Sequence, residues 1–148
     1  MRAAEDRLNG AFWLLRVVLG AGIAVAGLDK FFDLLTTWSM YLSPLAERLL
    51  PVSDERFLRA IGVLEVAIGL AILTRWPRLG AYALAVWLLG IVVNLALAGH
   101  FWDLVLRDLE GAAAAYALAR LAEWRAAIVS DAARALGPEG LRPQGARI

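Results

Sequence analysis

The feature that most constrains this chain is an apolar run from Leu79 to Gly99, which carries no formal charge over 21 residues. As an α-helix, such a run is long enough to cross the ~30 Å hydrocarbon core of a bilayer. The composition agrees, because 61% of the residues are hydrophobic and the mean hydropathy is +0.64. A soluble domain is about 45–50% apolar. A chain of 148 residues has too little polar surface to cover the excess.

The same composition excludes several classes of protein. Cysteine is absent, so disulfide chemistry, iron–sulfur ligation and thiolate zinc sites within this chain are excluded. The apolar content excludes a disordered chain, and a net charge of +1 argues against a nucleic-acid binder. The sequence holds no Walker loop, no G-x-G-x-x-G loop after a strand, and no nucleophile motif around its serines.

Three further segments resemble the first closely enough to predict four membrane helices. The fourth is the weakest, because its first half is charged and its second half is rich in alanine. Small residues let helices pack closely in a membrane, which favours its inclusion. The predicted fold is an all-α integral membrane four-helix bundle, with helices at about residues 11–30, 57–74, 79–99 and 101–127. This membrane domain, 11–129, is flanked by a cytoplasmic N-terminus, 1–10, and a polar cytoplasmic tail, 130–148.

The connection from Lys30 to Arg56 contains an amphipathic outer segment between the first and second helices. Its apolar residues recur mostly at helical spacing, which predicts a segment that lies in the membrane interface or caps the bundle. These residues are Phe31, Phe32, Leu34, Leu35, Trp38, Tyr41, Leu42 and Leu45. Tryptophans also fall at predicted helix boundaries, with Trp87 as the one exception at mid-span.

Basic residues predict the orientation. Ten of the fifteen Lys and Arg residues fall on the face that carries both termini, so the positive-inside rule places both termini in the cytoplasm. An alternative is a cleaved leader, because Ala24-Val25-Ala26 has the form of a cleavage site. The acidic residues Glu5 and Asp6 and the interrupting Arg16 disfavour that reading.

Six polar residues are expected at depth within the predicted spans, where ionised groups are costly and are usually paired. Depth along each helix, at about 1.5 Å per residue, predicts that Arg16 pairs with Glu65. A second polar layer is expected in the outer half of the bundle. The full set is Arg16, Glu65, Asn94, Arg107, Asp108 and Glu110. These groups either fix the helix register or line a polar cavity that holds a small redox ligand or relays protons.

A second set of residues is expected at the outer mouth of the bundle, namely Lys30, Trp38, Tyr41, His100 and Asp103. Trp38 and Tyr41 are interpreted as interfacial anchors in preference to a stacking platform. His100 is the only histidine, and ligation of a metal or haem iron is less favoured there than an interfacial position. No metal site is predicted.

Several short motifs keep the order and spacing of a known family. The first helix ends in Gly27-Leu28-Asp29-Lys30-Phe31, and the outer segment holds Trp38 and Tyr41-Leu42-Ser43-Pro44. Glu65 lies within Gly62–Leu70, Asn94 comes near the end of the third helix, and the fourth begins with Asp103 and Arg107-Asp108-Leu109. Over roughly residues 10–122 the chain resembles the DoxX superfamily of small four-helix bacterial and archaeal membrane proteins.

The resemblance implies a small subunit of a quinone-linked oxidoreductase, such as thiosulfate:quinone oxidoreductase, or a partner of other oxidoreductases. By motif position, Arg16 matches the arginine of the family's first helix and Lys30 the lysine that follows it. Glu65 matches the glutamate of the second helix, and Arg107-Asp108 matches the Arg-Asp pair of the fourth. It also implies a bacterial or archaeal inner membrane. A related branch uses cysteines for disulfide chemistry, and this chain has none.

Three functions remain open. The first is a subunit of a membrane redox complex that is not catalytic alone and whose polar cluster contacts a quinone. No intrinsic cofactor is expected. Bound lipid is expected. The second is a non-catalytic structural or assembly subunit of a larger membrane complex or homo-oligomer. The third is a small oligomeric transporter or channel, disfavoured because no inverted repeat is visible.

Overall fold

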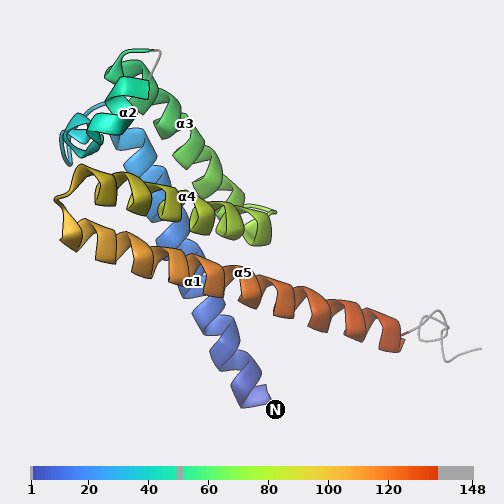
Figure 1. Cartoon of the computed structure of the whole chain (residues 1–148). Coiled ribbons are helices and arrows are strands. Elements are labelled where there is room, and N and C mark those ends of the chain that lie inside the picture. The colour runs from blue at the N-terminus through green and yellow to red at the C-terminus, as the bar shows by residue number, and fades with distance from the viewer. Residues whose placement is uncertain (1, 50–51, 137–148) are drawn as a thin grey trace, which may run out of the picture.

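The structure is a computed structural model that describes residues 2–49 and 52–136. These residues form helices and no strand. The elements are α1 (Arg2–Asp29), the 3-10 helix η1 (Trp38–Tyr41), α2 (Pro44–Leu49), α3 (Asp54–Leu73), α4 (Pro77–Ala98) and α5 (Trp102–Leu136). The four long helices alternate in direction, and η1 and α2 lie at the end of the bundle where α1 ends and α3 begins (Figure 1). The predicted all-α class with four main helices is confirmed.

Local chemistry explains the helix ends. Asp54 and Glu55 occupy the first turn of α3, where negative charge is favourable at the positive end of the helix dipole. Pro77 begins α4, a position where its missing N–H costs nothing, and Gly99 ends α4 with a left-handed φ of 77°. The turn between α3 and α4 spans only residues 74–76.

α1 and α5 extend farthest beyond their predicted bounds. α1 begins at Arg2, so the described part of the N-terminal segment 1–10 continues the first helix. α5 runs for 35 residues to Leu136 and projects past the rest of the bundle (Figure 1). Residues 137–148 of the predicted polar tail lie outside the described residues.

α1 and α3 pack backbone to backbone at two glycine pairs. A Cβ atom on Gly62 would lie 2.5 Å from the carbonyl oxygen of Gly27, and one on Gly69 would lie 2.6 Å from that of Gly20. The pairs are seven residues apart on each helix, so the same faces meet again after two turns. This glycine seam, formed by Gly20, Gly27, Gly62 and Gly69, fixes the antiparallel register of the two helices.

α4 and α5 form an antiparallel hairpin (Figure 1). Buried residues of α5 recur at steps of three and four: Val105, Asp108, Ala112, Ala115, Ala119 and Ala122. This spacing places them on one face of the helix. The core combines Ile68 and Ile72 of α3, Leu84 of α4 and Leu118 of α5 with Phe12 of α1.

Large apolar side chains also cover the outside of the long helices. Val63, Val86 and Leu106 are each more than 60% exposed, and similar residues occur along α1. Two helical segments, Glu5–Asp29 and Pro77–Ala98, are long and apolar enough to cross a membrane. Only 22% of the most apolar window of each is buried, whereas the core helix of a soluble protein is mostly buried.

The glycine seam is testable by substitution. Gly62→Ala should lower the free energy of unfolding by about 1–3 kcal/mol, because its Cβ would meet backbone atoms that cannot move away. Gly22→Ala is the matched control on α1, since nothing lies within 4 Å of its Cβ position. The control should gain about 0.5–1 kcal/mol through helix propensity. Unfolding in mild detergent measures the free energy of unfolding of both variants. Equal changes in the two variants would contradict close backbone packing at the glycine seam.

Candidate functional site

The most deeply buried ion pair joins the end of α1 to the middle of α3. Lys30 Nζ lies 2.6 Å from Glu65 Oε2, and the two side chains are 5% and 2% exposed. Gly27 makes this contact available, because a Cβ there would lie 2.8 Å from the Cβ of Glu65. An ionised pair in such surroundings needs good geometry and further hydrogen bonds to offset its desolvation.

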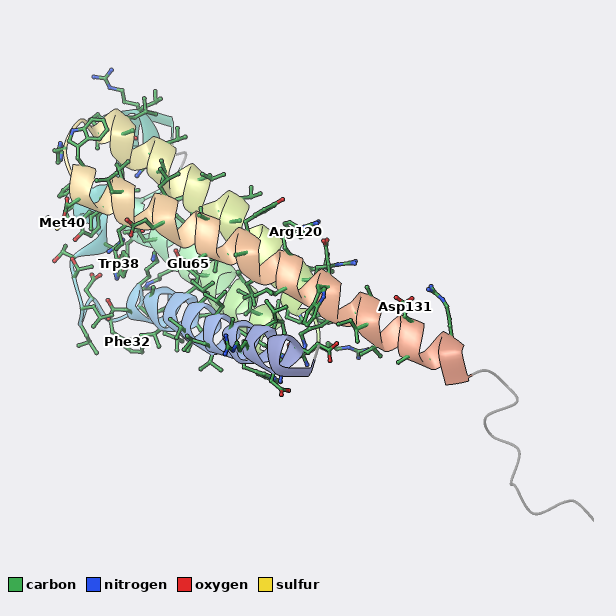
Figure 2. All side chains as sticks on the ribbon, turned by 90° about the horizontal axis from the view of Figure 1, so that it is seen from below. Phe32, Trp38, Met40, Glu65, Arg120 and Asp131 are labelled. Carbon is green, nitrogen blue, oxygen red and sulfur yellow. The ribbon has the colours of Figure 1, made fainter. Side chains whose placement is uncertain are left out.

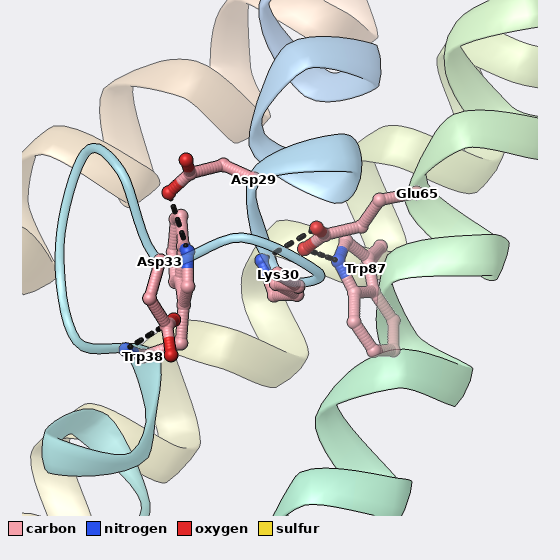
Figure 3. A network of polar contacts seen from close by, with 6 residues as sticks. All are labelled: Asp29, Lys30, Asp33, Trp38, Glu65 and Trp87. Carbon is pink, nitrogen blue, oxygen red and sulfur yellow. Dashed lines mark hydrogen bonds and ion pairs between the residues drawn. The ribbon is translucent and has the colours of Figure 1, made fainter.

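Two tryptophans supply those additional contacts (Figure 3). Trp87 Nε1, from α4, donates to Glu65 Oε1 at 3.1 Å, so each carboxylate oxygen has a donor. The ring of Trp38 lies over the Lys30 ammonium at 3.5 Å from the ring centroid, a cation–π contact. The ion pair therefore links α1, α3, α4 and η1.

Asp29 holds the loop that follows α1. Its carboxylate accepts hydrogen bonds from the backbone N–H groups of Leu34 and Leu35, at 3.0 and 3.1 Å, and from Trp38 Nε1 at 2.8 Å. Trp38 therefore bridges Asp29 and Lys30, as Figure 3 shows. We call Asp29, Lys30, Trp38, Glu65 and Trp87 the buried network.

The predicted pairing of Arg16 with Glu65 is wrong. Arg16 Nε donates to the carbonyl of Ile72 at 2.8 Å, and Nη2 donates to the carbonyls of Leu73, at 2.9 Å, and Thr74. A cation at these unsatisfied carbonyls is favourable, because they form the negative end of the α3 dipole. The glycine seam explains the difference, since its register places Arg16 level with the end of α3.

Asn94 contacts the outer segment. Its Oδ1 accepts from the backbone N–H of Ser43 at 3.1 Å, and its Nδ2 donates to the carbonyl of Tyr41 at 2.7 Å. Both polar atoms of the amide are thus used to attach the segment between η1 and α2 to α4. Tyr41 also packs edge-on against Phe101, with ring centroids 5.0 Å apart.

The three residues of the predicted polar set that lie on α5 do not share one environment. Asp108 is buried and accepts from Arg107 Nε at 3.0 Å. The Arg107 side chain is itself 66% exposed, and Glu110 is exposed. The polar layer expected in the outer half of the bundle therefore does not include the side chains of Arg107 and Glu110. The predicted polar set is divided among separate places: Glu65 in the buried network, Arg16 at the end of α3, Asn94 at the outer segment, and the charges of α5.

The remaining outer-mouth residues lie at the surface. His100 and Asp103 are exposed, and the His100 ring lies 4.4 Å from that of Phe101. Among residues 2–49 and 52–136, no group of three or more His, Cys, Asp or Glu side chains could hold a metal ion. Within the same residues, no buried side-chain nitrogen or oxygen lacks a hydrogen-bond partner.

Two shallow apolar grooves lie on the surface. One, between α3 and α4, is lined by residues that include Ala67 and Trp76. The other, between α4 and α5, has Tyr82 and Tyr116 among its lining. Neither lining includes a residue of the buried network.

Sequence reasoning missed the partners of Glu65, although one signal was present. Trp87 is the only tryptophan away from a predicted helix boundary, and a buried indole N–H usually needs an acceptor. That requirement points to a carboxylate at mid-bundle. Nothing comparable in the sequence indicates that Lys30 folds back onto Glu65.

The buried ion pair can be tested with a double-mutant cycle. Lys30→Met should cost about 3–5 kcal/mol of unfolding free energy, because Glu65 is left buried without its cation. The double variant Lys30→Met/Glu65→Leu should recover most of that loss, since an apolar pair carries no desolvation penalty. Arg59→Ala breaks the exposed pair with Glu55 and should cost under about 1 kcal/mol. This account would be contradicted if the double variant lost as much unfolding free energy as the two single variants, Lys30→Met and Glu65→Leu, lose together.

The Arg16 contacts give a separate prediction. Arg16→Met keeps the length of the side chain but removes the donors to the end of α3, which should cost about 1.5–3 kcal/mol. Amide hydrogen exchange in the last turn of α3 should accelerate, while exchange near Gly62 stays unchanged. Unaltered exchange in that last turn would show that the contacts do not stabilise it.

The comparisons with known proteins identify no relative. No family model, no curated protein and no solved structure matches this chain.

Proposed function

We propose that this chain is an integral membrane protein whose four long helices form a bundle in a bacterial or archaeal inner membrane, with both termini in the cytoplasm. In this proposal it is a non-catalytic subunit that stabilises a larger membrane complex or a homo-oligomer. The observation that carries the proposal is the distribution of exposed side chains on the long helices. In water, so large an apolar surface would favour aggregation.

Exposed charge is sparse along the middle of the helices. The exposed residues from 79 to 99 on α4 and from 60 to 73 on α3 carry no formal charge, and those from 17 to 28 on α1 carry none either. Val18, Val63 and Val86 lie within these stretches and are more than half exposed. Such a surface matches hydrocarbon, while the charged ends match the aqueous faces.

α5 supports a role in assembly. Its longest uncharged stretch, from 111 to 119, is nine residues, which is short of the ~20 that a lone membrane helix needs. Arg107 and Glu110 are exposed on α5, with Glu110 roughly 12 Å from its start at about 1.5 Å per residue. Arg107 is paired with Asp108, whereas an exposed Glu110 at that depth requires a polar neighbour. We therefore infer that a partner helix or a second copy covers this face.

Membrane integration should be visible in fractionation. The full chain should stay with membranes through alkaline carbonate washing and leave them only with detergent, because apolar side chains surround the bundle. The protein should then purify with a partner or as an oligomer. Release by carbonate would contradict membrane integration.

The assembly face has its own test. Glu110→Leu should reduce the size of the purified assembly without lowering the unfolding midpoint of the chain, because its side chain lies on the surface. Arg134→Leu is the matched control on the projecting part of α5, where the side chain is 77% exposed and pairs with Asp131. An unchanged assembly in the Glu110→Leu variant would exclude this face as the contact.

A second candidate keeps the quinone function that the resemblance to the DoxX superfamily implies. It is favoured by one observation, the burial of an ionisable Lys30–Glu65 pair beside two indole rings. Ionisable side chains of this kind can donate or accept a proton at a quinone headgroup. Glu65→Gln in the intact complex should then slow electron transfer to quinone. Equal rates in the variant and the parent complex would leave Glu65 with a structural role.

A further inference from the structure

A dense patch of exposed apolar side chains lies in the loop after α1, outside the long helices. Phe32, Leu34 and Leu35 are 68%, 83% and 69% exposed, and Leu34 is the most exposed large apolar residue in the described part of the chain. Phe32 and Met40 lie at the end of the bundle that carries Trp38 (Figure 2). Apolar groups in such a position are stable only when something other than water covers them.

The loop is held in shape by its polar atoms, which turn inward. The backbone N–H groups of Leu34 and Leu35 both donate to the buried carboxylate of Asp29, which also accepts from the Trp38 indole. Trp38 in turn lies over Lys30 of the buried ion pair (Figure 3). With its N–H groups bonded inward, the loop presents adjacent apolar side chains to the outside.

The surroundings of the loop favour lipid over a protein partner as the cover. Phe31 and Phe32 follow α1 directly in the chain, and the exposed apolar side chains of that helix include Val25 and Leu28, at 53% and 51%. Between residues 31 and 46 the only formal charge is Asp33, whose carboxylate accepts from the backbone N–H of Trp38. The patch therefore offers almost no charge for specific pairing with a protein.

We propose that residues 31–35 form an interfacial membrane anchor, with Phe32, Leu34 and Leu35 inserted between lipid headgroups and upper acyl chains. The inference rests on the proposed membrane location and adds a separate contact to it. Asp29 and Trp38 act as positioning residues for the anchor. The buried network then contributes to lipid binding, because it fixes the depth of the loop relative to α1 and α3.

The test uses the absence of cysteine, which makes single-cysteine variants of the full chain unambiguous. Phe32→Cys and Leu34→Cys report on the anchor, and Val86→Cys reports on the middle of α4. Glu55→Cys is the matched control, because its side chain is 72% exposed near the same end of the bundle. Each variant carries an environment-sensitive fluorophore and is reconstituted in phosphatidylcholine vesicles containing lipids with a nitroxide near the headgroup or deep in the acyl chain.

The expected result is a pattern of depths. Probes at 32 and 34 should show blue-shifted emission and stronger quenching by the shallow nitroxide, whereas the probe at 86 should be quenched by the deep one. The probe at 55 should keep emission typical of water. Water-like emission at 32 and 34 with deep quenching at 86 would overturn the anchor alone. Water-like emission at all of these positions would overturn the membrane location as well.

The positioning role has a further readout. Asp29→Ala in the Phe32→Cys background should shift the emission toward that of water, because the loop loses three hydrogen bonds to the carboxylate. Trp38→Phe removes the indole N–H and one of the two fused rings, keeps an aromatic ring beside Lys30, and should produce a smaller shift. Should Asp29→Ala fail to fold, Trp38→Phe still decides the question. Unchanged emission in a folded variant would overturn the role of Asp29 and Trp38.

Discussion

The arrangement depends on the close approach of α1 and α3 at the glycine seam. With no side chain at Gly20, Gly27, Gly62 or Gly69, the two backbones come into contact. Helices in membranes gain little from excluding water from each other, so close packing of this kind contributes much of their association. The same approach brings Lys30 within 2.6 Å of Glu65 and Arg16 to the end of α3. Both contacts follow from the register that the glycines set.

The α4–α5 hairpin completes the site from the other side. Alanines on α5 let it lie along α4, and α4 supplies the Trp87 indole that satisfies the second oxygen of Glu65. Asn94, farther along α4, attaches the outer segment through the backbone of Tyr41 and Ser43. The charges at the end of the bundle are thus held by contacts from several helices. That is typical of groups that must be satisfied within the protein where water is scarce.

The positions of the helices agree with the prediction where the sequence signal is local. Apolar runs, the Pro77 start and the Gly99 end place the helices, because these depend on neighbouring residues. The predicted pairing of Arg16 with Glu65 is wrong, because depth along separate helices does not determine the register between them. Arg16 and Glu65 were expected at similar depth, yet Gly20 faces Gly69, so Arg16 lies near Ile72. The outward direction of Arg107 was missed for the same reason: spacing along α5 defines a face but not which neighbour that face meets.

By itself, the sequence determined that this protein is helical, that it carries more apolar surface than its core can bury, and that its uncharged runs are bounded by charge. These properties follow from composition and local periodicity. Only the tertiary structure decided that Glu65 pairs with Lys30, that Trp87 completes the pair, and that Asp29 folds the apolar loop outward. Lys30 and Glu65 are 35 residues apart. Such partners are chosen by helix crossing and register, which depend on contacts between distant segments.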